Sequence, residues 1–150
     1  MKIILGCDHG GIAVKNAVCD FFKDSAQITD LGTATEAAVD YPDFAAKAAR
    51  AIVEGSADFA VLICRTGMGM AMTANRFSGV RASVCDTVEK ARRTRQHNHA
   101  NVLCLPGTID TALAQEIAKA FFAEPCDCAP RHLNRLSKLE RCDRMAEFSY

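Results

Sequence analysis

The segment VLICRTGMGMAMTAN, residues 61–75, contains the residues of this sequence best suited to proton transfer. An apolar run ends at Cys64, and a turn with Gly67 and Gly69 leads into a helical pattern. A thiolate can take a proton and return it, and the free N–H groups that open a helix favour negative charge beside them. Two interpretations are open: Cys64 is a catalytic base, or it is a buried residue at a strand end.

A second segment, CDHGG (7–11), has the same form, because Asp8 and His9 directly follow the first apolar run of the chain. The carboxyl ends of parallel strands meet at one edge of a sheet, where ligands bind. We therefore expect both residues to lie beside Cys64 and Thr66, in a crevice between the first and third strands. A loop that only connects two elements needs neither an Asp-His nor a Cys-Thr pair.

The elements that must position these residues are five short apolar runs alternating with segments of helical spacing. The runs cover 2–7, 26–32, 58–64, 79–85 and 100–107, and the helical segments cover 11–23, 42–54, 68–76, 87–96 and 110–123. This alternation predicts an α/β fold, a doubly wound five-stranded parallel sheet of flavodoxin-like or Rossmann-like order, in a single domain over 1–150. The tail, 129–147, is predicted to form an extra, basic and amphipathic C-terminal helix that packs on its own domain or contacts a partner subunit.

Composition excludes several classes of partner. Formal net charge is +0 over 150 residues, which gives no reason to expect nucleic acid. The apolar runs are too short to cross a bilayer and no secretion signal is evident, so we predict a cytoplasmic protein with no membrane contact. The eight cysteines are expected to be reduced thiols. No metal is predicted, because Cys126, Cys128 and His132 lack zinc-knuckle spacing, and no cofactor, because GMGMAM lacks the third glycine of a dinucleotide fingerprint.

Five motifs in order resemble the family of ribose-5-phosphate isomerase B, which also includes galactose-6-phosphate and allose-6-phosphate isomerases. They are GCDHGG, VDYPDFA, LICRTGMGMAMTANR, RQHNHANVLCLPG and RHLNRLSKL. The resemblance covers nearly the whole chain. It implies an aldose–ketose isomerase of α/β fold that acts on a phosphorylated sugar through a cis-enediolate, without metal or nucleotide, as a homodimer or homotetramer.

The resemblance also implies a role for individual residues. Cys64 would move the proton between C1 and C2 with help from Thr66, His97 would open the sugar ring, and Asp8 would handle a hydroxyl proton. Substrate would be bound by the turn amides of Gly67, Met68, Gly69 and Met70, by Asn98, and, at the phosphate, by His9, Arg131 and Arg135.

Each role has a plainer alternative. His97 could be a helix-end histidine favoured by the dipole, and Arg131 and Arg135 could form a solvated face. Asp40 either lines the sugar site or caps the helix that follows it. His99 and His132 are expected to be structural.

Two departures from the family pattern concern the anion. Arg65 stands where the family usually has glycine, and Thr108 stands where many members have a further phosphate-binding arginine. We expect Arg65 to reach the substrate and partly replace that cation; the alternative is that it points to solvent or pairs with an acid. The substrate is then ribose 5-phosphate, a close analogue, or another pentose or hexose 6-phosphate. A non-catalytic module that binds a phosphorylated metabolite is the alternative of a different class.

His97 ends the helix that precedes the fifth strand, which predicts a position near the amino ends of the strands, opposite Cys64. His97 and Asn98 would then complete the site of a neighbouring subunit, and Arg131 and Arg135 on the tail helix could do the same. The sequence therefore predicts an active site shared between subunits.

Overall fold

The computed structural model describes residues 1–142 and confirms the alternation of strands and helices expected from the sequence. The elements are β1 (Lys2–Cys7), α1 (Ile12–Phe22), β2 (Gln27–Asp30), α2 (Tyr41–Val53), β3 (Phe59–Cys64), α3 (Met68–Ala74), β4 (Ala82–Val84), α4 (Val88–Asn98), β5 (Val102–Pro106), α5 (Thr111–Ala123) and α6 (Pro130–Leu139).

The sheet is wholly parallel, but its strand order differs from the flavodoxin-like order that was expected. The order is β2-β1-β3-β5-β4, so the last two strands are exchanged. Burial explains the exchange: β5 is almost entirely buried, whereas the three residues of β4 are only partly buried. A strand covered on both faces belongs in the middle of a parallel sheet, and a short, partly polar strand is tolerated at its edge.

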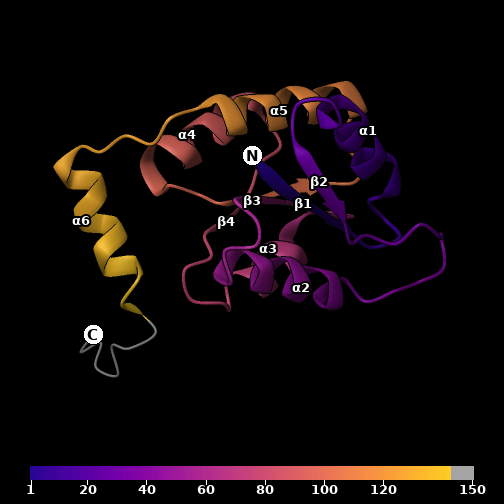
Figure 1. Cartoon of the computed structure of the whole chain (residues 1–150), viewed down its shortest axis with the longest axis horizontal. Coiled ribbons are helices and arrows are strands. Elements are labelled where there is room, and N and C mark those ends of the chain that lie inside the picture. The colour runs from indigo at the N-terminus through magenta and orange to yellow at the C-terminus, as the bar shows by residue number, and fades with distance from the viewer. Residues whose placement is uncertain (143–150) are drawn as a thin grey trace.

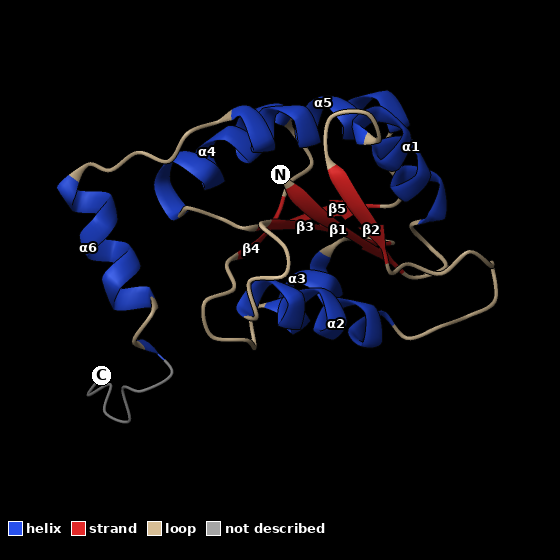
Figure 2. Ribbon diagram, viewed as in Figure 1, coloured by secondary structure: helices blue, strands red, loops and turns tan. Residues whose placement is uncertain are grey.

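Helices cover both faces of the sheet, as Figures 1 and 2 show, with α1, α4 and α5 on one side and α2 and α3 on the other. The strand order explains this division. The chain moves in one direction along the sheet from β1 to β2 and from β4 to β5, and in the opposite direction from β2 to β3 and from β3 to β4. Because crossovers between parallel strands are right-handed, the two directions place their helices on opposite faces.

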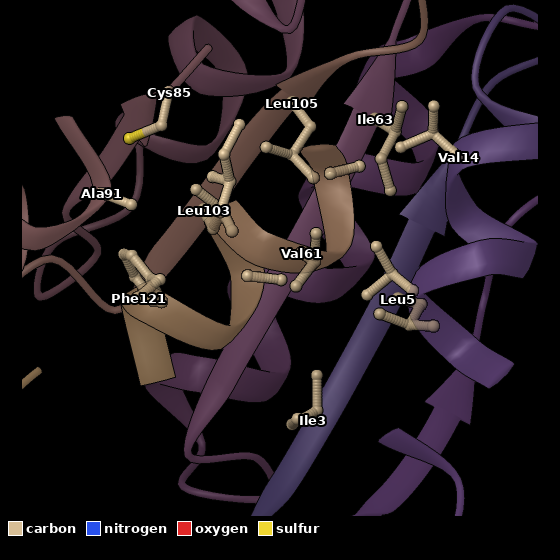
Figure 3. Packing of buried hydrophobic residues seen from close by; sticks show 14 of the residues in the cluster. Ile3, Leu5, Val14, Val61, Ile63, Cys85, Ala91, Leu103, Leu105 and Phe121 are labelled. Atoms are coloured by element: carbon tan, nitrogen blue, oxygen red, sulfur yellow. The ribbon is translucent and has the colours of Figure 1, made fainter. Parts of the chain in front are cut away.

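Alternate residues of the central strands pack into two separate cores. One core, beneath α1, α4 and α5, contains Leu5, Val61, Ile63 and Leu103 (Figure 3). The other core, beneath α2 and α3, contains the strand residues that alternate with these and point to the opposite face, including Cys64. This alternation directs the Cys64 side chain toward α3 rather than α1.

An ion pair between a buried lysine and an exposed aspartate holds the segment after β2 against the body of the protein. Lys15 of α1 is buried, and its Nζ lies 2.6 Å from Oδ2 of Asp30 at the end of β2 and 3.5 Å from the carbonyl oxygen of Thr33. A buried ammonium group needs such oxygens, because an unpaired charge in the interior is strongly unfavourable. The pair therefore fixes where the loop 31–40 leaves the sheet.

The C-terminal helix α6 lies to one side of the layered body and contacts α4 (Figure 1). It begins one residue later than predicted and ends at Leu139, and the predicted continuation over 143–147 lies outside the described residues. Leu133 and Leu139 are 45% and 50% exposed. In the part of the chain that is described, no helix is long and apolar enough to cross a membrane.

The carboxyl edge of the sheet is closed by contact between the loops that follow β1 and β5. A Cβ atom added at Gly107 would overlap the carbonyl oxygen of Gly10. We predict that Gly107→Ala lowers the free energy of unfolding by about 1–3 kcal/mol, because backbone must move to admit the methyl group. Urea unfolding measures this. Thr108→Ala is the control, since Thr108 is exposed and its truncation should change stability by less than about 0.5 kcal/mol. Equal free energies of unfolding for the two variants would show that the loops after β1 and β5 can move apart without loss of stability.

Candidate active site

The loops after β1 and β3 lie side by side, as the sequence predicted. The N–H of Asp8 donates to the carbonyl oxygen of Ile63 at 3.2 Å. A Cβ atom on Gly10 would come within 3.2 Å of the Arg65 backbone nitrogen. Since α1 and α3 leave the sheet on opposite faces (Figure 1), the chain diverges between β1 and β3, which is the kind of point where open α/β sheets bind ligands. The same divergence occurs between β3 and β5, so the end of β3 is flanked by two such points.

Cys64 ends β3 at the centre of this edge. Its side chain is 5% exposed, and its carbonyl oxygen accepts the N–H groups of Gly107 at 2.8 Å and Gly67 at 3.3 Å. The backbone that carries the thiol is therefore held from two neighbouring loops. Cys64 is, as the plainer alternative expected, a mostly buried strand-end residue; its location at this edge is what a catalytic base also requires.

The turn after Cys64 leaves fewer free amides than the sequence suggested. Gly67 has φ +74°, a left-handed conformation that suits glycine, and its N–H is already bonded to Cys64. The N–H of Met68 donates to Oγ1 of Thr66 at 3.3 Å. Within residues 1–142, the amides of Gly69 and Met70 have no acceptor. These two groups are thus the ones available to an anionic oxygen, and Met70 offers only its amide because its side chain is buried.

Asp8 and His9 face this edge in different ways. Asp8 is 7% exposed, and its Oδ1 accepts the N–H of Gly10 at 2.8 Å. His9 is exposed, and its Nδ1 accepts the N–H of Val39 at 3.3 Å. With Nδ1 as acceptor, the proton of the neutral ring is on Nε2, which is free to donate to an anion. Asp8 is therefore positioned as a proton acceptor and His9 as a donor.

Asp40 occupies the N-cap position of α2, but its side chain makes no capping hydrogen bond. The carboxylate is exposed. Of the two interpretations that the sequence left open, capping is therefore not supported, and the carboxylate has no partner among residues 1–142.

Arg65 projects from the turn after β3 with an exposed side chain. It makes no hydrogen bond and no ion pair with any of the residues 1–142, so pairing with an acid is not observed in the described part of the chain. Thr108, also exposed, follows the end of β5 on the same edge of the sheet. Arg65 and Thr108 thus lie on loops that follow two neighbouring strands, β3 and β5.

The remaining predicted site residues lie at the opposite edge of the sheet, as expected for His97. Ala60 pairs with Val102 and Cys64 with Pro106, so the start and the end of β5 differ by about 13 Å along the strands. His97 and Asn98 end α4, just before β5 begins. Figure 1 shows α4 ending on the left, next to α6, while the loop before α2 extends to the right.

Arg131 and Arg135 belong to this second group, since both are exposed residues of α6. Asn98 lines a cavity of about 480 Å³ together with Arg81 and Glu140, whose side chains form an ion pair at 2.5 Å. One chain therefore brings together Asp8, His9, Asp40, Arg65 and the residues 64–70, but not His97, Asn98, Arg131 or Arg135.

Two residues near these groups were not assigned a functional role from the sequence. Tyr41, within the motif VDYPDFA, lies with its ring so close to Gly69 that an added Cβ would be 2.6 Å from the ring. In the sequence, the only signal for a role of Tyr41 beside the Gly69 amide was its place in the motif VDYPDFA. His132, expected to be structural, is buried and stacks on His97 with 4.4 Å between ring centroids.

Three other buried thiols are poorly suited to proton transfer. Burial raises the pKa of Cys7 and of Cys85 to about 11, and it raises the pKa of Cys104 well above its usual value. These thiols stay protonated near neutral pH. Within residues 1–142 no group of three side chains is arranged to hold a metal ion, and Cys126 and Cys128 are not gathered with a third ligand.

A thiol, a buried carboxylate and two free amides at one edge of a doubly wound sheet form the kind of site that moves protons in an α/β enzyme. Comparison with known proteins gives the class as isomerase. The family model described as Ribose/Galactose Isomerase matches residues 3–139, and the chain belongs to that family.

Similar proteins include enzymes with different named substrates. A solved ribose 5-phosphate isomerase from Thermotoga maritima is 39% identical with a TM-score of 0.90, covering 93% of this chain and 97% of that one. Ribose-5-phosphate isomerase B of Escherichia coli is 35% identical over 140 residues, 92% of this chain and 93% of that protein. A 4-deoxy-4-sulfo-D-erythrose isomerase from a Clostridium strain is 37% identical over 124 residues, 81% of this chain and 78% of that protein.

Proposed function

We propose that this protein interconverts a phosphorylated aldose and its ketose through a cis-enediolate, with Cys64 as the base. The observation that carries the proposal is the position of Cys64 at the end of β3, between the loop of Asp8 and the free amides of Gly69 and Met70. Enolisation needs a base that removes the substrate's carbon-bound proton and fixed hydrogen-bond donors that stabilise the adjacent oxygen.

The proposed reaction transfers two protons. The Cys64 thiolate removes the proton from C2 of the open-chain aldose, and the electron pair moves to form the C1–C2 double bond of the enediolate. The developing negative charge on oxygen is stabilised by the amides of Gly69 and Met70. Asp8 and Thr66 move the hydroxyl proton from O2 to O1, and the Cys64 thiol then returns its proton to C1. The thiolate is regenerated and no cofactor is consumed.

A cyclic sugar must open before this step, and we assign ring opening to His97 of a neighbouring subunit. His97 and Asn98 lie at the far edge of the sheet from Cys64, together with Arg131 and Arg135. A second copy of the chain would bring such a group to the crevice, with the two arginines binding phosphate. The two exposed leucines of α6 would be buried in the same contact. We therefore propose a homodimer, or a homotetramer built from it, with shared sites.

Ribose 5-phosphate or a close analogue is the first substrate to test, followed by allose and galactose 6-phosphates. Because Arg65 and Thr108 depart from the family's usual residues, we expect the anionic group at the end of the sugar to be bound by a different set of side chains. One relative is named for a sugar that ends in a sulfonate, so sulfonated tetroses belong in the same panel. Interconversion followed by NMR identifies the sugar.

The first prediction concerns the base. Cys64→Ala should lower the turnover number at least 100-fold, as expected when a general base is lost, while the sugar phosphate still binds. Incorporation of deuterium from solvent at C2 of the sugar, measured by NMR, should be lost in this variant together with turnover. Cys85→Ala is the control, because that thiol is buried and protonated. Near-normal exchange in Cys64→Ala would place the base elsewhere.

The second prediction concerns the shared site. Cys64→Ala and His97→Ala proteins are each inactive, but in a hybrid dimer one of the two sites contains neither change. After mixing in equal amounts and full subunit exchange, specific activity should reach about one quarter of wild type, since about half of the dimers are hybrids. Native mass spectrometry verifies the exchange. Hybrids without activity would contradict sharing.

The third prediction concerns Arg65. Arg65→Gly should raise KM for the preferred sugar about tenfold or more, the equivalent of a charge-assisted hydrogen bond of about 1.5–3 kcal/mol. The turnover number should change less, because anion binding is common to ground and transition states.

Arg76→Gly, which removes another exposed arginine, is the control for the change in net charge. Adding Thr108→Arg to Arg65→Gly should recover part of the loss or move preference toward ribose 5-phosphate. Unchanged kinetics of Arg65→Gly over the whole panel would leave this arginine without a role in binding.

A further inference from the structure

His132 is one of four buried polar or charged residues in residues 1–142, and the mechanism above gives it no part. It lies in the first turn of α6, is 3% exposed, and faces α4 although its helix otherwise lies apart from the body. Burying an imidazole is unfavourable unless its polar atoms find partners. The contacts of this ring therefore need an explanation.

One contact joins His132 to a predicted phosphate-binding residue. Nε of Arg131 donates to Nε2 of His132 at 3.1 Å. A guanidinium group can only donate, so Nε2 must be unprotonated, and the ring proton is on Nδ1. Nδ1 has no hydrogen-bond partner among the described residues. The arrangement thus requires one particular tautomer of a neutral ring.

The charges around the ring favour that neutral form. Burial lowers the pKa of His132, and the neighbouring His97 of α4 and Arg131 and Arg135 of α6 lower it further. Asp127, in the segment before α6, acts in the opposite direction, with Oδ2 lying 3.4 Å from Nε2. A protonated ring would turn Nε2 from an acceptor for Arg131 into a donor to Asp127. Above the ordinary histidine pKa of 6.5 the ring is neutral and keeps its bond to Arg131.

The second contact joins His132 to the predicted ring-opening residue. The rings of His97 and His132 are stacked with an interplanar angle of 3° and a centroid distance of 4.4 Å. His97 itself is only half-buried, so a flat, buried neighbour is what restricts the rotation of its ring. His132 thereby contacts two predicted site residues from two different helices at once.

We propose that His132 is a positioning residue, which fixes the ring plane of His97 by stacking and orients the guanidinium of Arg131 by accepting its Nε–H. The proposal rests on the proposed function, because it takes His97 as the ring-opening group and Arg131 as a phosphate ligand. It assigns separate parts of one side chain to separate steps: the ring face to ring opening, and Nε2 to anion binding.

Two variants separate these contributions. His132→Phe keeps a flat ring against His97 but removes the acceptor for Arg131, whereas His132→Gln keeps an acceptor but removes the stack. His132→Phe should raise KM about tenfold and leave the turnover number within about twofold, as expected for loss of ground-state binding. His132→Gln should lower the turnover number by about 10- to 100-fold, the effect of a misplaced catalytic group.

His99→Asn is the matched control. His99 also contacts Asp127, through a hydrogen-bond distance of 3.1 Å between its Nε2 and the Asp127 carbonyl oxygen, but it does not stack on His97. Its φ of 48° is one that asparagine tolerates. This variant should retain wild-type kinetic constants.

Ring opening can be measured apart from isomerisation in the Cys64→Ala background, where the enzyme should still exchange the two anomers of the preferred sugar. Adding His132→Gln should slow anomer exchange, observed by NMR saturation transfer, at least tenfold. Adding His99→Asn should leave it unchanged. If His132→Phe and His132→Gln raise KM by the same factor and lower the turnover number by the same factor, the division of roles is overturned.

A readout without substrate separates failure of this proposal from failure of the proposed function. In protein labelled with ¹⁵N at arginine and histidine, a coupling across the hydrogen bond should link Arg131 Nε to His132 Nε2 at pH 7.5 and vanish in His132→Phe. Absence of that coupling in the wild-type protein overturns the proposal. A normal coupling, together with no isomerase activity on any sugar of the panel, overturns the proposed function alone.

Discussion

The backbone at the end of β3 is the constraint on which the site depends. The Cys64 carbonyl oxygen accepts the N–H groups of Gly67 and Gly107, from its own turn and from the loop after β5. The Gly10 loop after β1 closes against Gly107 without room for a side chain. Because β3 sends its helix to one face while both neighbouring strands send theirs to the other, the chain diverges on both sides of this strand end. The backbone that carries the thiol is therefore fixed relative to the turn that follows it.

The same topology explains why one chain does not bring all of the predicted site residues together. A helix that returns from the carboxyl edge of a parallel sheet must end at the amino edge, so the last residues of α4 lie far from Cys64. The end of α4 and the α6 helix gather there, with the His97 and His132 rings in contact. The two groups of predicted site residues therefore lie at opposite edges of the sheet, and the homodimer proposed above would bring them together.

Much of this was visible in the sequence, because strands and helices follow from local periodicity. The five runs and five intervening helices appear within a few residues of their expected positions. The strand order was wrong for β4 and β5, although the stronger apolar character of VLCLP compared with ASV could have indicated which of them is central. Order depends on how completely each strand is covered on both faces, which is a property of the assembled layers.

By itself, the sequence determined which residues could do chemistry and which edge they occupy: a residue that directly follows a parallel strand can lie only at its carboxyl end. Only the tertiary structure decided which groups remain free. It bonded the amides of Gly67 and Met68 within the turn, left those of Gly69 and Met70 free, and gave Asp40 no capping role. It also turned His132 inward onto His97 and Arg131. The His97–His132 stack joins residues far apart in sequence, so no local pattern encodes it. The turn bonds and the Arg131–His132 bond are local, but they depend on backbone and side-chain conformations that packing selects.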